Sequence, residues 1–199
     1  EWAVMQEDFI VFGSPLIGDQ EVAEVVACME SSWLGTGPRV ARFEADFAAY
    51  QGVGRATVSA VNSCTAALHL ALIAAGLEPG AEVITTPLTF CATVNAIIHA
   101  GLIPVLADVD PVTQCICPEA IEAAITSRTA AVVPVHFAGR PCEMDAIMRI
   151  ANKHGLVVIK DCAHAIETEY HGRKAGTFGD FGCFSFYATK NITTGEGGM

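Results

Sequence analysis

Two residues late in the sequence have the type and setting that chemistry requires. Asp161 ends an apolar run, where an unpaired carboxylate would be costly. Such a carboxylate is either held by backbone N–H groups or kept for a cation, such as a protonated heteroaromatic nitrogen. Lys190 leaves the apolar run 183–187 and enters a loop rich in Thr and Gly. A partly desolvated lysine has a depressed pKa and is nucleophilic when neutral, and a solvated loop lysine is the alternative.

Two further polar groups follow predicted strands. Ser63 and Thr65 open a predicted helix directly after an apolar run. Free N–H groups and the positive end of the helix dipole favour a phosphate there, and the alternative is that Ser63 or Thr65 is only an N-cap. His164, three residues after Asp161, could orient that carboxylate or pack against a ring. A hydrogen-bonded core histidine is the alternative for His164.

The elements that must position these residues follow a regular alternation. Because strand, helix, strand at this rhythm is typical of a mostly parallel sheet flanked by helices, we expect an α/β fold. The apolar runs are nearly continuous, as in strands covered on both faces, and ligands bind at the carboxyl ends of such strands. Strands are predicted at 56–61, 82–85, 103–107, 130–135 and 156–159, and helices at 19–32, 40–50, 65–75, 89–100, 118–125 and 144–153.

Composition excludes several classes of protein. The chain has 199 residues and a net charge of −11, so we expect no nucleic-acid binding, which depends on Lys and Arg. No run approaches the roughly 18 apolar residues of a membrane span, and the N-terminus does not read as a signal peptide. We therefore expect a cytoplasmic protein without a membrane partner. The eight cysteines are expected to stay reduced, and the close pair Cys115 and Cys117 lacks a second pair for a metal site.

Several motifs, in this order along the chain, together resemble the DegT/DnrJ/EryC1/StrS family. Members of this family are pyridoxal 5'-phosphate (PLP)-dependent aminotransferases that act on nucleotide-linked keto-sugars. The resemblance begins at about residue 14 and continues to the end. The motifs are S-W-L-G-T-G-P at 32–38, T-A-A-L at 65–68, P-L-T-F-C-A-T-V-N-A-I at 87–97, D-V-D-P at 108–111, V-H-F-A-G at 135–139, D-C-A-H-A at 161–165, G-T-F-G-D at 176–180 and F-S-F-Y-A-T-K-N-I-T-T-G-E-G-G at 184–198.

The resemblance implies the large domain of a PLP-dependent fold type I transferase, with the C-terminal small domain absent. Residues 1–52 are expected to form an N-terminal helical segment. Residues 53–199 are expected to form the PLP-binding large domain, truncated at its C-terminal end. A sheet strand that relatives place between other strands would then follow Met199.

The resemblance also implies two catalytic roles. Lys190 matches the lysine that forms a Schiff base with the cofactor and later moves a proton between two carbons. Asp161 matches the acid that pairs with the pyridine nitrogen and makes the ring an electron sink. A single strand is expected to hold Ser185 and Lys190 in a fixed relation.

Other residues match cofactor ligands. Ser185 matches a phosphate ligand, as do Thr65 and Ala66 at the helix N-terminus. Phe90 lies where relatives stack an aromatic ring on the cofactor. His164 lies where a His or Gln supports the ring. No metal is implied.

The function that the resemblance implies is transfer of an amino group to a nucleotide-linked keto-sugar in a homodimer, with glutamate as the expected donor. Lys190 favours transamination, because relatives that dehydrate sugars carry histidine at that position. The alternative is a truncated or degenerate homologue that binds PLP or dimerises without turnover. A different doubly wound nucleotide-binding protein is disfavoured, because no G-x-G-x-x-G pattern follows the first predicted strand.

Overall fold

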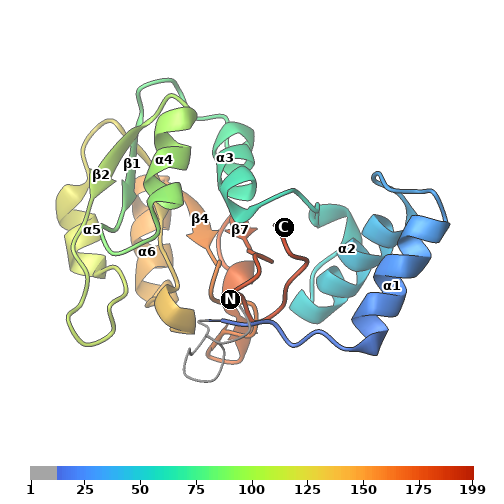
Figure 1. Cartoon of the computed structure of the whole chain (residues 1–199). Coiled ribbons are helices and arrows are strands. Elements are labelled where there is room, and N and C mark those ends of the chain that lie inside the picture. Colours follow the sequence, from blue (N-terminus) through green and yellow to red (C-terminus); the bar gives the residue numbers. More distant parts are fainter. Residues whose placement is uncertain (1–12) are drawn as a thin grey trace, which may run out of the picture.

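The computed structural model describes residues 13–199, and its centre is a five-stranded parallel sheet (Figure 1). The order of the strands across the sheet is β2-β1-β3-β4-β7, and every neighbouring pair is parallel. The expected mostly parallel α/β fold is therefore confirmed. The strands are β1 (Glu82–Thr85), β2 (Ile103–Leu106), β3 (Thr129–Val133), β4 (Val157–Asp161) and β7 (Phe181–Cys183), and a small antiparallel pair joins β5 (Glu169–Tyr170) to β6 (Arg173–Lys174).

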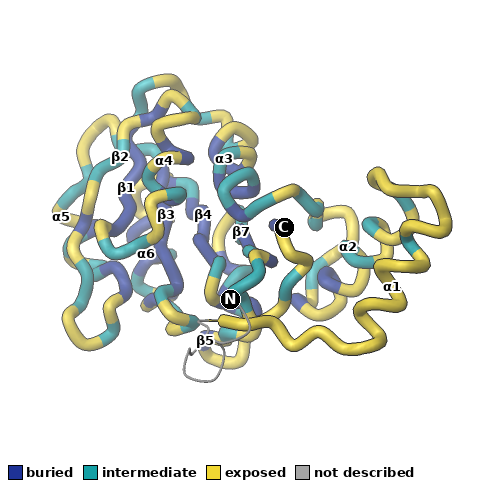
Figure 2. Tube along the Cα trace, viewed as in Figure 1, coloured by how far each residue is buried: buried dark blue, intermediate teal, exposed yellow. Residues whose placement is uncertain are grey.

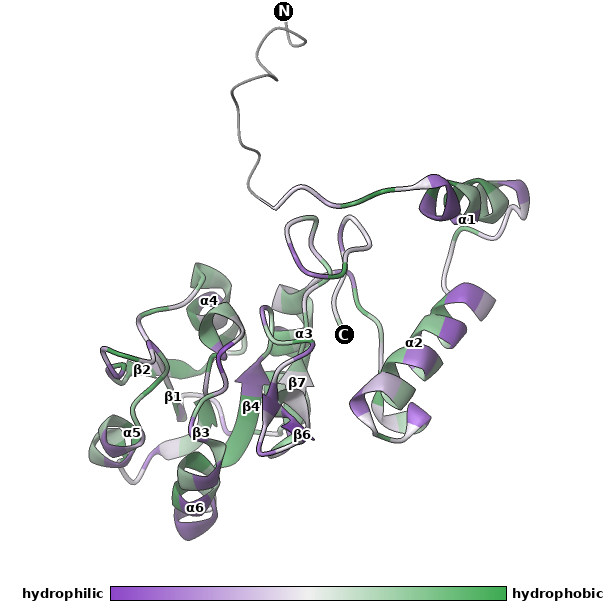
Figure 3. Cartoon of the chain, turned by 90° about the horizontal axis from the view of Figure 1, so that it is seen from below, coloured by the Kyte–Doolittle hydropathy of each residue, from purple (hydrophilic) through white to green (hydrophobic). Residues whose placement is uncertain are grey.

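Helices cover both faces of the sheet, as Figure 3 shows from below. Helices α3 (Cys64–Ala74) and α4 (Cys91–His99) lie on one face, and α5 (Pro118–Ala124) and α6 (Met144–His154) lie on the other. Before the sheet come α1 (Asp19–Glu30) and α2 (Pro38–Gln51), which project to one side. Short 3-10 turns are η2 (Arg55–Thr57), η3 (Phe137–Gly139) and η4 (Ala175–Thr177).

The core consists of two layers, one on each side of the strands. Val83 packs with α3 and α4, whereas the next residue, Ile84, packs with α5 and α6. Figure 2 shows the resulting band of buried residues along the strands. Because both faces are covered, the inner strands carry the continuous apolar runs seen in the sequence. Phe47 of α2 joins a third cluster with Phe184 and Phe186.

Two predicted strands are wrong in detail. Residues 55–57 form η2, and only Val61 of the predicted strand 56–61 is paired, in an antiparallel bridge with Gly198. The strand predicted at 183–187 overlaps β7, which spans Phe181–Cys183, only at Cys183. The parallel partner β4 ends at Asp161 opposite Cys183, so the chain beyond pairs with another neighbour. Phe184 and Met199 exchange backbone hydrogen bonds instead.

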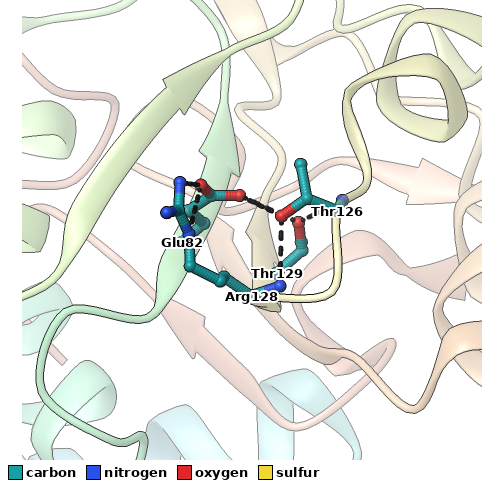
Figure 4. A network of polar contacts seen from close by, with 4 residues as sticks. All are labelled: Glu82, Thr126, Arg128 and Thr129. Atoms are coloured by element: carbon teal, nitrogen blue, oxygen red, sulfur yellow. Dashed lines mark hydrogen bonds and ion pairs between the residues drawn. The ribbon is translucent and has the colours of Figure 1, made fainter.

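The amino ends of β1 and β3 are joined by a polar network (Figure 4). Glu82 is 4% exposed and accepts from the Thr126 hydroxyl at 2.5 Å and from Arg128 Nε at 2.9 Å. These hydrogen bonds, that of Thr126 above all, lower the pKa of the Glu82 carboxyl. The network stabilises the side of the sheet where these strands begin. The polar residues with predicted roles lie on the opposite side, where the strands end.

Predictions about the chain's ends and cysteines have mixed outcomes. The signal-peptide prediction and the start of the segment 1–52 lie outside the described residues, and the division at residue 52 stays a prediction. All eight cysteines are free thiols. Five are buried (Cys64, Cys115, Cys142, Cys162 and Cys183), Cys28 and Cys117 are partly buried, and Cys91 is exposed at the start of α4.

Candidate active site

The carboxyl ends of the strands surround a pocket of about 510 Å³, which we call the inner pocket. Every predicted site residue except Ala66 lines it. These residues come from the start of α3, the turn before α4, the end of β4 and the chain after β7, and they are Thr65, Phe90, Asp161, His164, Ser185 and Lys190. The fold therefore brings to one place residues that are up to 125 positions apart in the sequence (190 − 65).

Asp161 is the buried acid of the inner pocket, with 5% of its surface exposed. Its Oδ2 accepts from the Thr93 hydroxyl at 2.7 Å, and its Oδ1 accepts from the Ala163 N–H at 3.0 Å. Burial raises the pKa of this carboxyl, and the hydrogen bonds from Thr93 and Ala163 and the charges of His164 and Lys190 oppose that rise. The hydrogen bonds thus orient the carboxylate, and a cation beside it would stabilise its charged form.

Thr93 is a site residue to which the sequence analysis gave no role. It lies on α4 and is 1% exposed, and its hydroxyl also lies 2.7 Å from that of Thr89, which lines the inner pocket. The two threonines are four residues apart, with Thr89 in the turn before α4 and Thr93 in the first turn of the helix. The spacing of the two threonines is visible in the sequence. It does not indicate a contact with Asp161, which depends on α4 lying beside the end of β4.

The N-terminus of α3 opens into the inner pocket. Ser63 is the N-cap, and its hydroxyl accepts from the Ala66 N–H at 3.1 Å. The N-cap alternative is therefore correct for Ser63, and the N–H of Ala66 is already used. The N–H groups of Cys64 and Thr65 donate to no acceptor within residues 13–199, and both residues line the pocket. Two free donors at the positive end of a helix dipole suit a phosphate.

Lys190 lies in a loop, residues 187–196, that we call the lysine loop. A short antiparallel ladder joins residues 184–186 to residues 197–199 at the base of the loop. Ser185 is therefore fixed in the ladder, but Lys190 lies in the loop. The prediction that a single strand holds both residues is wrong. The Lys190 N–H donates to the Tyr187 carbonyl at 2.9 Å, which forms a turn that presents the lysine to the pocket.

Aromatic groups line the rest of the inner pocket. Phe90, just before α4, is 76% exposed and so leaves a free ring surface beside the pocket. His164 is exposed at the mouth of the pocket, and partial desolvation lowers its pKa, with a contribution from the charge of Lys190 and opposition from Asp161. His164 packs edge-on against Phe137 at 6.4 Å between ring centroids.

His136 also borders the inner pocket, but its ring belongs to the core. Its Nδ1 accepts from the Cys142 N–H at 3.0 Å, and its Nε2 has no hydrogen-bond partner among the described residues. Burial, with a contribution from the charge of Lys160, lowers its pKa to about 4. A neutral, fixed imidazole is a structural support for the rim rather than an acid or base.

A second, more open cavity of about 590 Å³ adjoins the inner pocket, and we call it the outer cavity. It shares His164, Thr189 and Lys190 with the inner pocket. Its other walls are Ala138, Gly139, Glu167, Thr168 and Asn191. Lys190 therefore stands at the boundary of the two spaces.

The donor set fits PLP and does not point to a metal. Free helix N–H groups suit the phosphate, a buried carboxylate suits the pyridinium, and a lysine suits the aldehyde. Within residues 13–199 no group of three or more His, Cys, Asp or Glu could hold a metal ion. The same part of the chain has no helix that is both long enough and apolar enough to cross a membrane.

Comparison with known proteins agrees with this geometry. Residues 15–199 match the model of the DegT/DnrJ/EryC1/StrS aminotransferase family. The spore coat polysaccharide biosynthesis protein SpsC of Bacillus subtilis is 56% identical over 191 residues, which are 96% of this chain and 49% of SpsC. The chain thus spans about half the length of this relative.

Solved structures share the fold. The PLP form of Spr1654 from Streptococcus pneumoniae superposes with a TM-score of 0.88 at 35% identity, over 95% of this chain and 52% of that one. DesI, crystallised in the presence of its TDP-sugar product, gives 0.85 at 41% identity, over 95% of this chain and 48% of DesI. Because the family model matches almost the whole chain and the inner pocket carries the expected residues, this chain belongs to the DegT/DnrJ/EryC1/StrS aminotransferase family.

Proposed function

We propose that this chain is the cofactor-binding part of a PLP-dependent aminotransferase that moves an amino group, from glutamate, to a nucleotide-linked keto-sugar. The observation that carries the proposal is the joint placement of Lys190, the buried Asp161 and the free N–H groups of α3 around one pocket. A chance cluster of polar residues would not combine a nucleophile, an acid and an anion site.

Each residue has a distinct part in this proposal. Cys64 and Thr65 bind the phosphate through their N–H groups, and Ser185 lies on the same wall. Asp161 would keep a proton on the pyridine nitrogen. The hydroxyl of Thr93 fixes the direction of the Asp161 carboxylate. When bound, the cofactor supplies an electron sink for the carbon that loses its proton.

Lys190 has two tasks in the proposal. Its amine would attach the cofactor to the chain and, when free, would carry a proton between two carbons. The boundary position of Lys190 supports both tasks, because its side chain borders the inner pocket and the outer cavity. Phe90 and His164 flank the site of the ring.

The substrate and the partner are proposed by analogy. DesI was crystallised with a TDP-sugar product, and SpsC is named for polysaccharide biosynthesis, which supports a nucleotide-linked sugar. Helix α1 buries none of its residues, and Val22, Val25, Val26 and Met29 are exposed on it, which supports a second copy as partner (Figure 2). Light scattering of the wild type and of Val25→Glu tests the dimer, which the charge should weaken.

The experiment that tests the proposed function is a trapping reaction. PLP is added to the chain, the visible spectrum is recorded, and borohydride then fixes the cofactor for peptide mapping by mass spectrometry. We expect the label on Lys190 alone, and none in Lys190→Ala. A label spread over other lysines, or retained in Lys190→Ala, would refute the role of Lys190.

A second measurement separates turnover from binding only. Amino transfer from glutamate to a nucleotide-linked keto-sugar is expected of the enzyme. This assay uses a chain extended to the length of its relatives. If that chain is labelled at Lys190 but transfers no amino group, a homologue that binds PLP without turnover is favoured.

A further inference from the structure

Few side-chain hydrogen bonds hold the tip of the lysine loop. At its base, the Thr194 N–H and the Thr193 hydroxyl both donate to the Phe186 carbonyl at 3.0 Å. Within residues 13–199, only one side chain of the loop hydrogen-bonds to a residue outside 184–199. That side chain is Asn191, whose Nδ2 donates to Glu167 Oε1 at 2.9 Å and to Oε2 at 3.1 Å.

Glu167 is a fixed point from which to hold the loop. The Ile166 carbonyl accepts from Gln51 at 3.1 Å, and Ile166 packs in the core. The Thr168 hydroxyl donates to the Gly139 carbonyl at 2.6 Å, and the Thr168 carbonyl accepts from the Ala175 N–H. Because the backbone is tied on both sides of Glu167, its exposed side chain extends from a fixed position on the body of the protein.

The carboxylate is also uncommitted to any cation. No Lys, Arg or His of the described chain lies within 4 Å of the Glu167 carboxylate, although Lys174 Nζ contacts the Glu167 backbone carbonyl at 3.4 Å. An isolated surface glutamate is ordinarily solvated, but this one uses both oxygens on one amide. A hydrogen bond to a charged acceptor is stronger than one to a neutral group.

The contact lies on the wall of the outer cavity, next to Lys190 in sequence and in space. We propose that Glu167 is a positioning residue for Lys190: by holding the amide of Asn191, its carboxylate fixes the direction in which the neighbouring lysine points. This role of Glu167 rests on the proposed function of Lys190. The contact between Glu167 and Asn191 can be tested without the cofactor.

The variants exploit the polarity of the contact. Glu167→Ala and Asn191→Ala each remove it, so the double variant should be no worse than either single one. Glu167→Gln keeps one acceptor oxygen but loses the charge, so it should fall between Glu167→Ala and the wild type. Asn191→Asp places two carboxylates face to face and should be the worst. Combining Asn191→Asp with Glu167→Gln reverses donor and acceptor and should restore the contact.

Two measurements report on these variants. Hydrogen exchange of amides 187–193 in the cofactor-free chain should become about 10-fold faster in Glu167→Ala, since one such hydrogen bond contributes on the order of a tenfold change in local opening. The rate at which PLP is fixed onto Lys190 by cyanoborohydride should fall in parallel. Glu122→Ala, which removes an exposed contact to Lys153 between α5 and α6, is the matched control and should change neither.

The outcomes separate this inference from the proposed function. The inference is overturned if Glu167→Ala leaves loop exchange within about twofold of the wild type, or if adding Glu167→Gln does not improve Asn191→Asp. If wild-type Lys190 takes up no PLP, the proposed function fails, while the exchange measurements still decide whether Glu167 orders the lysine loop.

Discussion

Asp161 is a buried carboxylate whose charge is only partly stabilised by its neighbours. Its carboxylate has two hydrogen bonds and no ion-pair partner in the described chain, so burial outweighs the groups that stabilise its charge. The site is therefore preorganised for a cation at the cost of stability when that cation is absent. The neighbouring Thr93 restricts the carboxylate to one direction.

The raised pKa of Asp161 predicts how stability depends on pH. A carboxyl with a raised folded pKa stabilises the folded chain below its unfolded pKa of about 3.9, and that contribution is lost as pH rises through the folded pKa. Asp161→Asn should remove this loss, so that the cofactor-free variant is more stable than the wild type at neutral pH. Urea unfolding at a series of pH values tests this. A variant less stable than the wild type at neutral pH would contradict it.

Thr93→Val should show the opposite change in stability. Valine has the shape of threonine but lacks the hydroxyl that donates to Asp161 Oδ2. Loss of a hydrogen bond to a buried carboxylate should lower the free energy of unfolding by about 2 kcal/mol. Thr93→Ser keeps the hydroxyl and serves as the control. Equal urea midpoints for Thr93→Val and the wild type would show that the Thr93 hydroxyl does not support the acid.

At the scale of elements, β7 decides where Ser185 and Lys190 lie. This strand pairs with β4 along only three residues, and Gly182 faces Lys160 in that register. A Cβ on Gly182 would lie 2.4 Å from the Gly176 carbonyl oxygen, so the turn at η4 packs directly on the strand. A glycine at this position lets the two backbone segments approach.

Gly182→Ala should therefore displace β7 or η4. The clash is with backbone rather than with a flexible side chain, and such overpacking costs about 3 kcal/mol. Gly35→Ala is the control, because a Cβ at Gly35 would meet nothing within 4 Å. Thermal unfolding compares the two variants, and labelling of Lys190 by PLP and borohydride should weaken only in Gly182→Ala. Similar melting temperatures for both variants would contradict the packing argument.

At the scale of the whole molecule, the sheet has an unfilled side beyond β7. Gly198 bridges both Val61 and Ser185, so the chain reaches Met199 between two segments that run in the opposite direction. A cavity of about 210 Å³ continues in that direction, lined by Val58, Ser59, Phe181, Gly182 and the buried Lys160. The strand that the family resemblance implies after Met199 stays a prediction.

In a chain that continues past Met199, we predict that the next residues pair with β7 on one side and with residues 58–60 on the other. Backbone groups on the free edge of β7 would then gain partners. Hydrogen exchange at Phe181–Cys183 should be at least about 10-fold slower than in the 199-residue chain, on the order of one hydrogen bond gained per amide. The opposite edge strand, β2, is the internal control and should not change. Unchanged exchange at β7 would mean that the added residues lie elsewhere.

The sequence alone determined the local elements and the candidates for chemistry. Short runs rich in Val, Ile and Ala predicted β1, β3 and β4, because apolar side chains are needed where both faces of a strand are buried. Residue type and local setting made Asp161 and Lys190 candidates, and the order of the motifs indicated the family. Local signals of this kind depend only on neighbours in the chain.

Only the tertiary structure decided which groups meet. Whether residues 56–61 and 183–187 form strands depended on distant partners. Only Val61 of the first run is bridged within the described chain, whereas residues 184–186 of the second pair with residues 197–199. The Thr93 hydroxyl on Asp161 and the Asn191 amide on Glu167 join residues 68 and 24 positions apart. No periodicity reports such contacts, because hydrogen bonds between distant segments exist only once packing has brought the segments together.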